Sequence, residues 1–202
     1  MRYNSPLADL PVEFVGSFPD PTHRLTPVLP EIVTLGRSNV GKSSLLNAVF
    51  DRPLAKVSGT PGRTALLNVF RLPSLYLLDL PGYGYAKVSH SERARYGRLV
   101  KTLIEQRTTI TGVLWLLDIR HEPSADDLTY AQEMEKRQLP ILVALTKADK
   151  LPHGQRLSRL KTIARQVGLP EEQVQLTSCL SGLGIVELGE SILAVADPSE
   201  AS

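Results

Sequence analysis

The stretch GRSNVGKSS, from Gly36 to Ser44, has the residue types and spacing of a loop that binds a phosphate chain. It matches G-x-x-x-x-G-K-[ST], and it follows an apolar run and precedes a stretch of helical period. Glycines let backbone N–H groups face phosphates, while Lys42 can reach the terminal phosphates and Ser43 a Mg²⁺ ion. The motif predicts a purine nucleoside triphosphate, against the alternative of a glycine-rich turn with a chance lysine. The loop residues are Gly36, Arg37, Ser38, Asn39, Val40, Gly41, Lys42, Ser43 and Ser44.

Two further segments carry chemistry that fits such a ligand. Asp79-Leu80-Pro81-Gly82 ends an apolar run, where an aspartate can join a Mg²⁺ shell and the glycine amide can contact a γ-phosphate. Thr146-Lys147-Ala148-Asp149 ends another run, and its carboxylate can accept N1–H and the 2-amino group of guanine. Adenine would leave that carboxylate facing an acceptor, which is strongly unfavourable. An aspartate before a Pro-Gly turn, as in Asp79–Gly82, is common by itself. The phosphate loop, this segment and Thr146–Asp149, occurring in this order, predict a guanine nucleotide site.

These segments must lie at strand ends. The chain alternates short apolar runs with stretches of helical period, a pattern typical of a mostly parallel sheet with helices on both faces. The link between the second and third runs is little more than Pro73, too short for a parallel crossover, so those two strands should pair antiparallel, with one antiparallel strand at the sheet edge. The predicted fold class is α/β with about six strands, at 31–36, 66–72, 74–80, 112–118, 139–146 and 174–178.

Apolar residues also repeat at helical spacing. They do so across 96–104 and across 157–167, the second beginning at Leu157, which predicts two amphipathic helices. Ser124 is a candidate N-cap for a helix over 125–138, and Gly168 should close the helix that ends before it.

Length and composition favour one domain. The chain has 202 residues, of which 42% are apolar and 22% charged, as in an ordinary globular protein. Residues 1–30 contain six prolines and little periodicity, so we expect a weakly structured lead-in with a candidate edge strand at 12–18. The predicted domain covers 31–196, and 197–202 form a tail.

Several protein classes are disfavoured. The longest apolar runs are far below the roughly 18–20 residues of a membrane-spanning helix, so we expect no membrane association. The N-terminus does not resemble a signal peptide, and one cysteine cannot form an internal disulfide, so a cytoplasmic location is expected. The single Cys179 is interpreted as a structural thiol rather than a redox sensor. The four histidines share no metal-ligand spacing, so no zinc site is predicted.

GRSNVGKSS, PGRT (61–64), DLPGYGYAKV (79–88), TKAD and SCL occur in the order of the Ras-like GTPase motifs. From about Val12 to Ala194 the chain resembles the EngB family (also called YihA or YsxC) of bacterial ribosome-assembly GTPases. The resemblance implies a three-layer, Ras-like P-loop NTPase fold and GTP as substrate, with Mg²⁺. It also implies a monomer that binds the large ribosomal subunit or its precursor and is needed for normal cell division and septation.

The resemblance also implies roles for individual residues. Ser43, Thr64 and Asp79 would bind Mg²⁺, and Asp79 to Gly82 would form the segment that senses the γ-phosphate. Catalysis would involve Lys42, Asn39, Thr64 and Gly82. The other implied nucleotide contacts are Gly62, Arg63, Thr64, Ala65, Leu66, Thr177, Ser178 and Cys179. The chain departs from the family at Ala65, where glutamine is frequent, and at Cys179, where small serines or alanine are usual.

The hydrolytic step is expected to be slow. A Ras-type GTPase uses a glutamine after D-x-x-G to orient the attacking water, and this chain has Tyr83 there. We therefore expect a switch whose GTP state docks a partner and whose hydrolysis releases it. The alternative is a guanine-nucleotide-dependent interaction module in cell division with negligible hydrolysis.

Asn39 has two interpretations. In several relatives of the same GTPase branch, an asparagine at this place helps hold a potassium ion against the phosphates, where a cation would stabilise developing charge. Alternatively, Asn39 suits a tight loop because asparagine tolerates unusual dihedral angles. Both remain open at this point.

A basic segment at 87–107 has two interpretations as well. It contains six basic residues, Lys87, Arg93, Arg95, Arg98, Lys101 and Arg107, against two acidic ones. Together with Tyr83, Tyr85 and Tyr96 it could contact RNA phosphates and bases. The alternative is the solvated face of an amphipathic helix.

Overall fold

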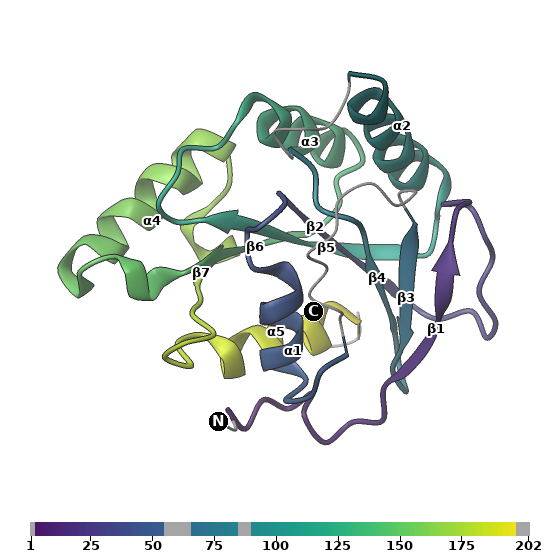
Figure 1. Cartoon of the computed structure of the whole chain (residues 1–202), viewed down its shortest axis with the longest axis horizontal. Helices are drawn as coiled ribbons and strands as arrows, with labels where there is room; N and C mark the ends of the chain where they lie inside the picture. The colour runs from purple at the N-terminus through teal and green to yellow at the C-terminus, as the bar shows by residue number, and fades with distance from the viewer. Residues whose placement is uncertain (1–2, 55–65, 85–89, 197–202) are drawn as a thin grey trace.

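A mostly parallel seven-stranded sheet forms the centre of the molecule (Figure 1). The structure is a computed structural model, and it describes residues 3–54, 66–84 and 90–196. The strands are β1 (Glu13–Phe18), β2 (Glu31–Gly36), β3 (Leu67–Arg71), β4 (Tyr76–Asp79), β5 (Ile110–Asp118), β6 (Ile141–Thr146) and β7 (Val174–Leu176). The helices are α1 (Lys42–Val49), α2 (His90–Gln106), α3 (Ala125–Lys136), α4 (His153–Val167) and α5 (Ile185–Ala196).

The strand order is β1-β3-β4-β2-β5-β6-β7. The predicted antiparallel pairing of β3 with β4 is confirmed, because the short link after Arg71 returns the chain directly alongside. β1 pairs antiparallel with the outer side of β3, so the reversed strand is second from the edge and β1 lies at the edge itself. The α/β fold class is confirmed. The candidate edge strand at 12–18 is β1, and it brings the six expected strands to seven.

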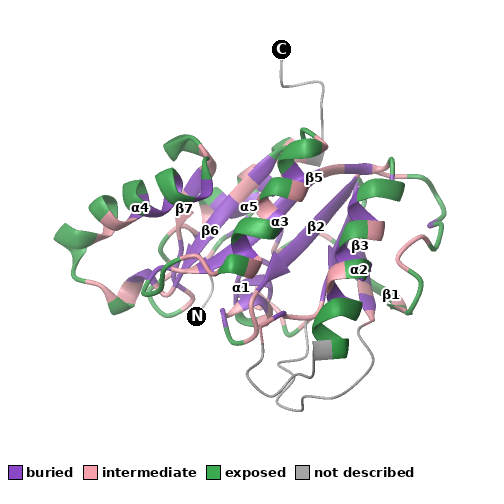
Figure 2. Cartoon of the chain, turned by 90° about the horizontal axis from the view of Figure 1, so that it is seen from above, coloured by how far each residue is buried: buried purple, intermediate pink, exposed green. Residues whose placement is uncertain are grey.

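Helices cover both faces of the sheet, which makes three layers. α2 and α3 lie on one face, and α1 and α5 lie on the other (Figure 1). Side chains of a strand alternate between the two apolar cores: Val113 and Trp115 pack under α2 and α3, whereas Leu114 and Leu116 pack against α1 and α5. Figure 2 shows the buried strands between more exposed helices. Strands buried on both faces explain the nearly continuous apolar runs of the sequence.

Most helix-end signals act as expected. Ser124 caps α3 and forms a capping box with Asp127, and Gly168 ends α4 in the left-handed conformation at φ 73°. The prediction that Leu157 lies on a buried face is wrong, since its side chain is 59% exposed. The buried residues of α4 begin at Leu160, so the first seven residues of the helix, Leu157 included, have no fully covered side chain.

The lead-in is more closely packed than its composition suggested. Leu7 is fully buried with α1 and α5, and the Tyr3 hydroxyl donates to the carbonyl of Cys179. The Arg52 guanidinium donates to the carbonyls of Ala8 and Leu10. Burial of one leucine and several side-chain-to-backbone bonds therefore attach a proline-rich segment that has little periodic structure.

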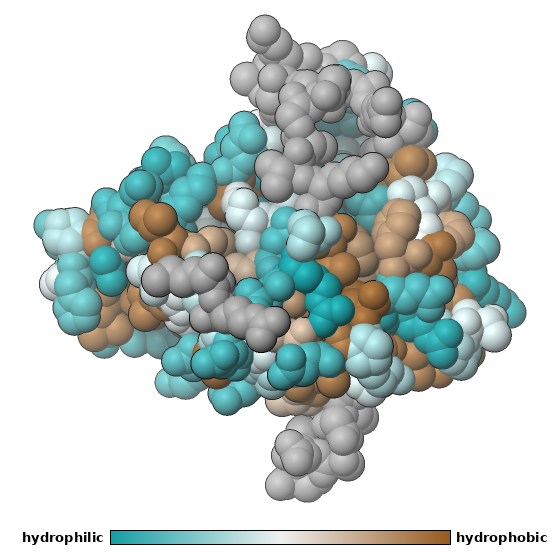
Figure 3. Space-filling model, turned by 60° about the horizontal axis from the view of Figure 1, so that its bottom comes forward, coloured by the Kyte–Doolittle hydropathy of each residue, from teal (hydrophilic) through white to brown (hydrophobic). Residues whose placement is uncertain are grey.

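No helix in the described part of the chain is long and apolar enough to cross a membrane. Exposed large apolar side chains are dispersed, from Phe14 in β1 to Val28, Leu157 and Leu180. On the face shown in Figure 3, hydrophobic residues lie among hydrophilic ones. Such dispersed exposure is ordinary for a protein surface.

Candidate functional site

The predicted phosphate loop lies between β2 and α1, at the end of the sheet where the parallel strands finish. Asn39 and Gly41 have positive φ angles of 65° and 101°, which curl the backbone between strand and helix. Gly41 is the residue before α1 and has no side chain to cap it, so the first-turn N–H groups can serve a phosphate. The left-handed angle also accounts for asparagine at position 39, because asparagine tolerates this conformation.

Lys42 and Asp79 meet at the floor of this loop. The Lys42 ammonium forms an ion pair with the Asp79 carboxylate, and their side chains are 10% and 6% exposed. Thr34 Oγ1 donates to the same carboxylate at 2.9 Å, because Thr34 and Asp79 are register partners on β2 and β4. The lysine predicted to bind phosphates and the aspartate predicted to bind Mg²⁺ thus lie side by side.

The residues fit a Mg²⁺ ion of the kind bound with a nucleotide. Ser43 follows Lys42 in α1, and Asp79 ends β4, so oxygen donors come from two adjoining elements. Across the described residues there is no group of three or more His, Cys, Asp or Glu side chains that could hold a metal alone. Mg²⁺ is usually bound by one or two carboxylates together with substrate phosphates, and such a site needs no larger cluster.

The segment after Asp79 lies directly against the phosphate loop. Ser38 Oγ donates to the Gly82 carbonyl at 3.0 Å, and Ser38 N donates to the Tyr83 carbonyl at 2.7 Å. A Cβ at position 82 would lie 2.8 Å from Ser38 N and Cα, closer than real contacts allow. Glycine is therefore required at position 82 by the approach of two backbones.

The Thr146–Asp149 segment is attached to the phosphate loop from the opposite side. Thr146 Oγ1 lies 2.7 Å from the Val40 carbonyl, to which it donates. Lys147 Nζ donates to the Asn39 carbonyl at 2.6 Å and lies 3.0 Å from Asp118 Oδ2. The predicted base-reading and phosphate-binding segments are therefore joined by two hydrogen bonds.

Asp149 is oriented by the loop that follows β7. Ser178 Oγ donates to Asp149 Oδ1 at 2.6 Å, and Ala148 N donates to the Thr177 carbonyl at 3.1 Å. The Ser178 bond is the main reason that the pKa of Asp149 is lowered from its ordinary value. An ionised carboxylate in a fixed position is the group that guanine recognition requires.

Cys179 supports this loop through its backbone. Its carbonyl accepts the Tyr3 hydroxyl, and burial raises the pKa of the thiol. A raised thiol pKa lowers thiolate reactivity, which supports the structural interpretation.

Some predicted residues cannot be placed in the site. Gly62, Arg63, Thr64 and Ala65 lie outside the described residues, as do Tyr85 and Lys87. Leu66 lies immediately before β3.

Asp118 was missed by the sequence reasoning. Burial by itself would raise its pKa, but bonds from Arg120 and Lys147 outweigh burial and lower it. Its position as the last residue of a buried strand, like that of Asp79, was the available signal.

The interpretation of the basic segment needs correction. Tyr83 and Tyr96 are 5% and 8% exposed and pack with Tyr130, so neither can stack on an RNA base. Arg107 is buried in an ion pair with Glu31 and cannot contact a phosphate. Tertiary packing removes these three residues from the surface that their spacing suggested. The exposed basic residues of α2 are Arg93, Arg95, Arg98 and Lys101.

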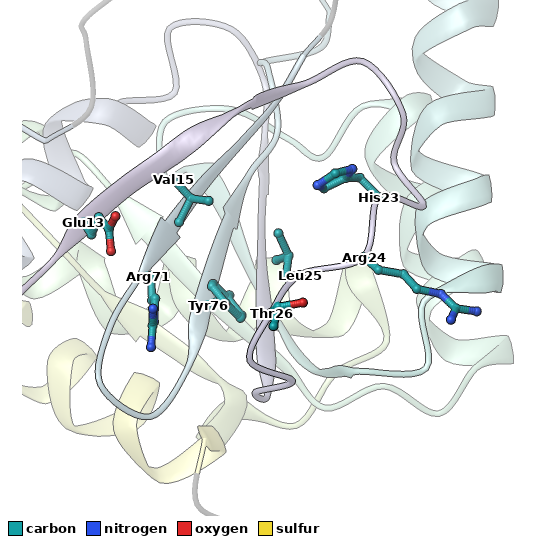
Figure 4. Close-up of a pocket in the computed structure, with 8 residues that line it drawn as sticks. All are labelled: Glu13, Val15, His23, Arg24, Leu25, Thr26, Arg71 and Tyr76. Carbon is teal, nitrogen blue, oxygen red and sulfur yellow. The ribbon is translucent and has the colours of Figure 1, made fainter.

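One cavity lies elsewhere. It has a volume of about 350 Å³ and is lined by residues that include Val15, Leu25, Arg71 and Tyr76 (Figure 4). Tyr76 begins β4, whereas Asp79 ends it, so the cavity lies away from the predicted site. In Figure 4 the Arg24 side chain points away from Leu25 and Tyr76.

Comparison with known proteins agrees with this geometry. The model of a family described as 50S ribosome-binding GTPase matches residues 31–147, more than half of the chain. "Probable GTP-binding protein EngB" of Desulfatibacillum aliphaticivorans is 42% identical over 183 residues, which cover 90% of this chain and 89% of that protein. The protein of the same name from Syntrophomonas wolfei is 45% identical over 162 residues, covering 79% and 83%.

The fold has a matching solved structure. A crystal structure of a probable GTP-binding protein EngB superposes with a TM-score of 0.67 at 21% identity, covering 82% of this chain and 98% of that one. At this identity the match bears on the fold, while the family rests on the sequence relatives. Taken with the phosphate loop and the base-reading loop, these matches show that the chain belongs to the EngB family of GTP-binding proteins and carries its GTPase domain.

Proposed function

We propose that this chain binds GTP with Mg²⁺ and hydrolyses it slowly, as a switch in assembly of the large ribosomal subunit. The observation that carries the proposal is the attachment of both Gly82 and Lys147 to the phosphate loop, through Ser38 and Asn39. A nucleotide held there would meet the γ-phosphate sensor and the base reader together. The family description as 50S ribosome-binding supports the choice of partner.

Each segment has a defined task in this proposal. The N–H groups before and within the first turn of α1 bind the phosphates, and Lys42 neutralises the terminal ones. Ser43, Asp79 and Thr64 would hold Mg²⁺, which supplies charge neutralisation on the phosphate oxygens when bound. Asp149 selects guanine.

Slow turnover follows from Tyr83. Its hydroxyl is bonded to Asp127 in the core, so the residue after Gly82 cannot orient a water as a glutamine would. Hydrolysis then depends on the partner, so the rate of hydrolysis sets the time at which the protein is released from that partner. The same feature favours the second candidate, an interaction module in cell division with negligible hydrolysis.

We further propose that the chain acts as a cytoplasmic monomer and that normal cell division and septation require it. The dispersed exposed apolar side chains support a monomer. A defect in septation would then be secondary to a shortage of large subunits, and ribosome profiles of depleted cells should change first.

Multiple-turnover phosphate release, with and without large ribosomal subunits, tests the reaction. We expect a low basal rate that subunits raise, with co-sedimentation in a GTP analogue and release in GDP. Failure to detect turnover in either condition would favour the interaction module.

The contact surface can be tested on α2. Charge reversal at Arg93, Arg95 and Arg98 should weaken co-sedimentation and flatten its salt dependence, because phosphate contacts release counterions. A matched control reverses three exposed basic residues of α3 and α4: Lys136, Lys161 and Arg165. Equal effects of the two triple variants would mean that α2 has no specific role.

A further inference from the structure

The residue after Gly82 ends in a buried polar cluster beneath α3. Tyr83 is 5% exposed, and its hydroxyl donates to Asp127 Oδ1 while accepting from Trp115 Nε1 at 3.2 Å. Burial, and then the negative charge of Asp127, raise the pKa of this tyrosine, so its hydroxyl keeps its proton. The segment that follows Asp79 thus has the Tyr83 side chain held inside the core.

Asp127 is itself held in place at the start of α3. Its second oxygen, Oδ2, accepts from Ser124 N at 2.7 Å and from Ser124 Oγ at 2.6 Å. Asp127 is 1% exposed, and a buried carboxylate is tolerated only when its oxygens are hydrogen-bonded. The capping box uses one oxygen, and Tyr83 uses the other.

The backbone of Tyr83 is fixed to the phosphate loop at the same time. Tyr83 N donates to the Gly36 carbonyl at 3.3 Å, and the Tyr83 carbonyl accepts from Ser38 N at 2.7 Å. Gly82 lies between this anchored residue and Asp79, in direct backbone contact with Ser38. The position of Gly82 is therefore determined from both of its ends.

We propose that Tyr83 is a positioning residue which, through its hydroxyl bond to Asp127, holds the Gly82 amide where a γ-phosphate would contact it. The proposal rests on the proposed function as a GTP switch. Without the bond, Gly82 is held by backbone bonds alone, and GTP binding must order the segment. GDP lacks the γ-phosphate, so its binding should be nearly indifferent to the bond.

The same aromatic cluster offers a matched control. Tyr96 lies beside Tyr83 with ring centroids 5.7 Å apart, and its buried hydroxyl has no hydrogen-bond partner within the described structure. Tyr96→Phe therefore removes the same atom from the same cluster without breaking a bond. Ser124→Ala is a second control: it removes the Ser124 Oγ bond to Asp127 Oδ2, but it leaves the Ser124 N bond to that oxygen and the Tyr83 bond to Oδ1.

The test measures dissociation constants of the three variants and the parent for fluorescent GDP and fluorescent GppNHp with Mg²⁺. In Tyr83→Phe we expect the GppNHp constant to rise about tenfold, the equivalent of about 1.4 kcal/mol. The GDP constant should change less than about twofold, and both controls should keep the parent's ratio.

The proposal is overturned if Tyr83→Phe keeps the parent's ratio of the two constants, or if Ser124→Ala changes that ratio equally, which would indicate general loosening. With either of these results, the proposed function is still supported as long as the parent protein binds both GDP and GppNHp. A parent that binds neither nucleotide overturns both proposals.

Discussion

In the proposed function, the choice of base depends on Asp149. Its carboxylate is ionised and oriented by Ser178, and only guanine presents two donors to it. An amide in its place presents a donor, which complements the 2-oxo group of xanthine instead of the 2-amino group of guanine.

Asp149→Asn should therefore weaken GTP binding about 10- to 100-fold, the size of a lost charged hydrogen bond, and shift preference toward XTP. Competition of GTP, XTP and ATP against a fluorescent guanine nucleotide measures the change. Full retention of GTP preference would exclude Asp149 as the base reader.

The same residue predicts a pH dependence. Its folded pKa is depressed below the ordinary value of 3.8, so the charged form persists above that value and is lost only as pH falls through the lowered pKa. The preference of the parent for GDP over ADP should stay level between about pH 5 and 8, because both nucleotides carry the same diphosphate and its ionisation cancels. A step in this preference within the range would point to a different titrating group at the base.

Asn39 can be tested without straining the loop. At a φ of 65° alanine would be strained, whereas glycine adopts this angle freely and removes only the amide. We expect GTP hydrolysis by the parent to be faster in potassium than in sodium at equal ionic strength, with the difference lost in Asn39→Gly. Equal parent rates in both salts, with ribosomal subunits present, would leave Asn39 with a backbone role only.

At the scale of elements, the end of β6 is joined to the loop before α1. The buried hydroxyl of Thr146 donates to the carbonyl of Val40 at 2.7 Å and lies 3.2 Å from the carbonyl of Leu117. Two strand-end loops of a parallel sheet are thereby held next to each other, as the proposed binding of one nucleotide across both loops requires.

Thr146→Val keeps the shape of the side chain but removes this donor. We expect the free energy of unfolding to fall by about 1–2 kcal/mol, since a buried acceptor loses its partner, and GDP affinity to fall several-fold. Thr162→Val, which removes an exposed bond within α4, is the matched control and should change neither quantity appreciably. A loss of stability with unchanged GDP affinity would show that the hydrogen bond from Thr146 to Val40 has no role in nucleotide binding.

At the scale of the whole molecule, Arg107 ties the lead-in to the sheet. Its guanidinium pairs with Glu31 at the start of β2 and donates to the carbonyls of Pro21 and His23. The Glu31 and Arg107 side chains are 3% and 6% exposed, so neither charge has water as an alternative partner.

Arg107→Met should therefore cost about 3–5 kcal/mol of unfolding free energy, because it leaves a buried carboxylate without its cation. Urea unfolding measures the loss. Lys101→Met in α2, the helix that ends just before Arg107, removes an exposed charge 3.7 Å from Glu105 and should change stability by less than about 0.5 kcal/mol. A similarly small loss for Arg107→Met would mean that Glu31 is solvated or otherwise compensated.

The sequence by itself determined the features that local rules govern. Four features depend only on a few neighbouring residues: the phosphate loop motif, the Ser124 cap, the Gly168 helix end and the antiparallel β3–β4 pair. In each of them, the types of these residues specify the local backbone geometry and hydrogen bonding. The parallel sheet also followed, because strands buried on both faces are apolar throughout. Because the three predicted nucleotide-binding segments follow apolar runs, they could be expected to lie together at the carboxyl ends of the parallel strands.

Only the tertiary structure decided which polar residues of one pattern face water. Arg93 and Arg107 look alike in the sequence, yet one is exposed and the other is paired with Glu31, 76 residues away. Tyr83 is likewise a core residue, bonded to Asp127 and Trp115, and Tyr96 packs against Tyr83 and Tyr130. Lys147 bonds to the Asn39 carbonyl, 108 residues away in the sequence. Helical or strand period shows only which side of its own element a residue occupies. Whether that side is covered depends on distant elements, whose positions follow from packing the whole chain.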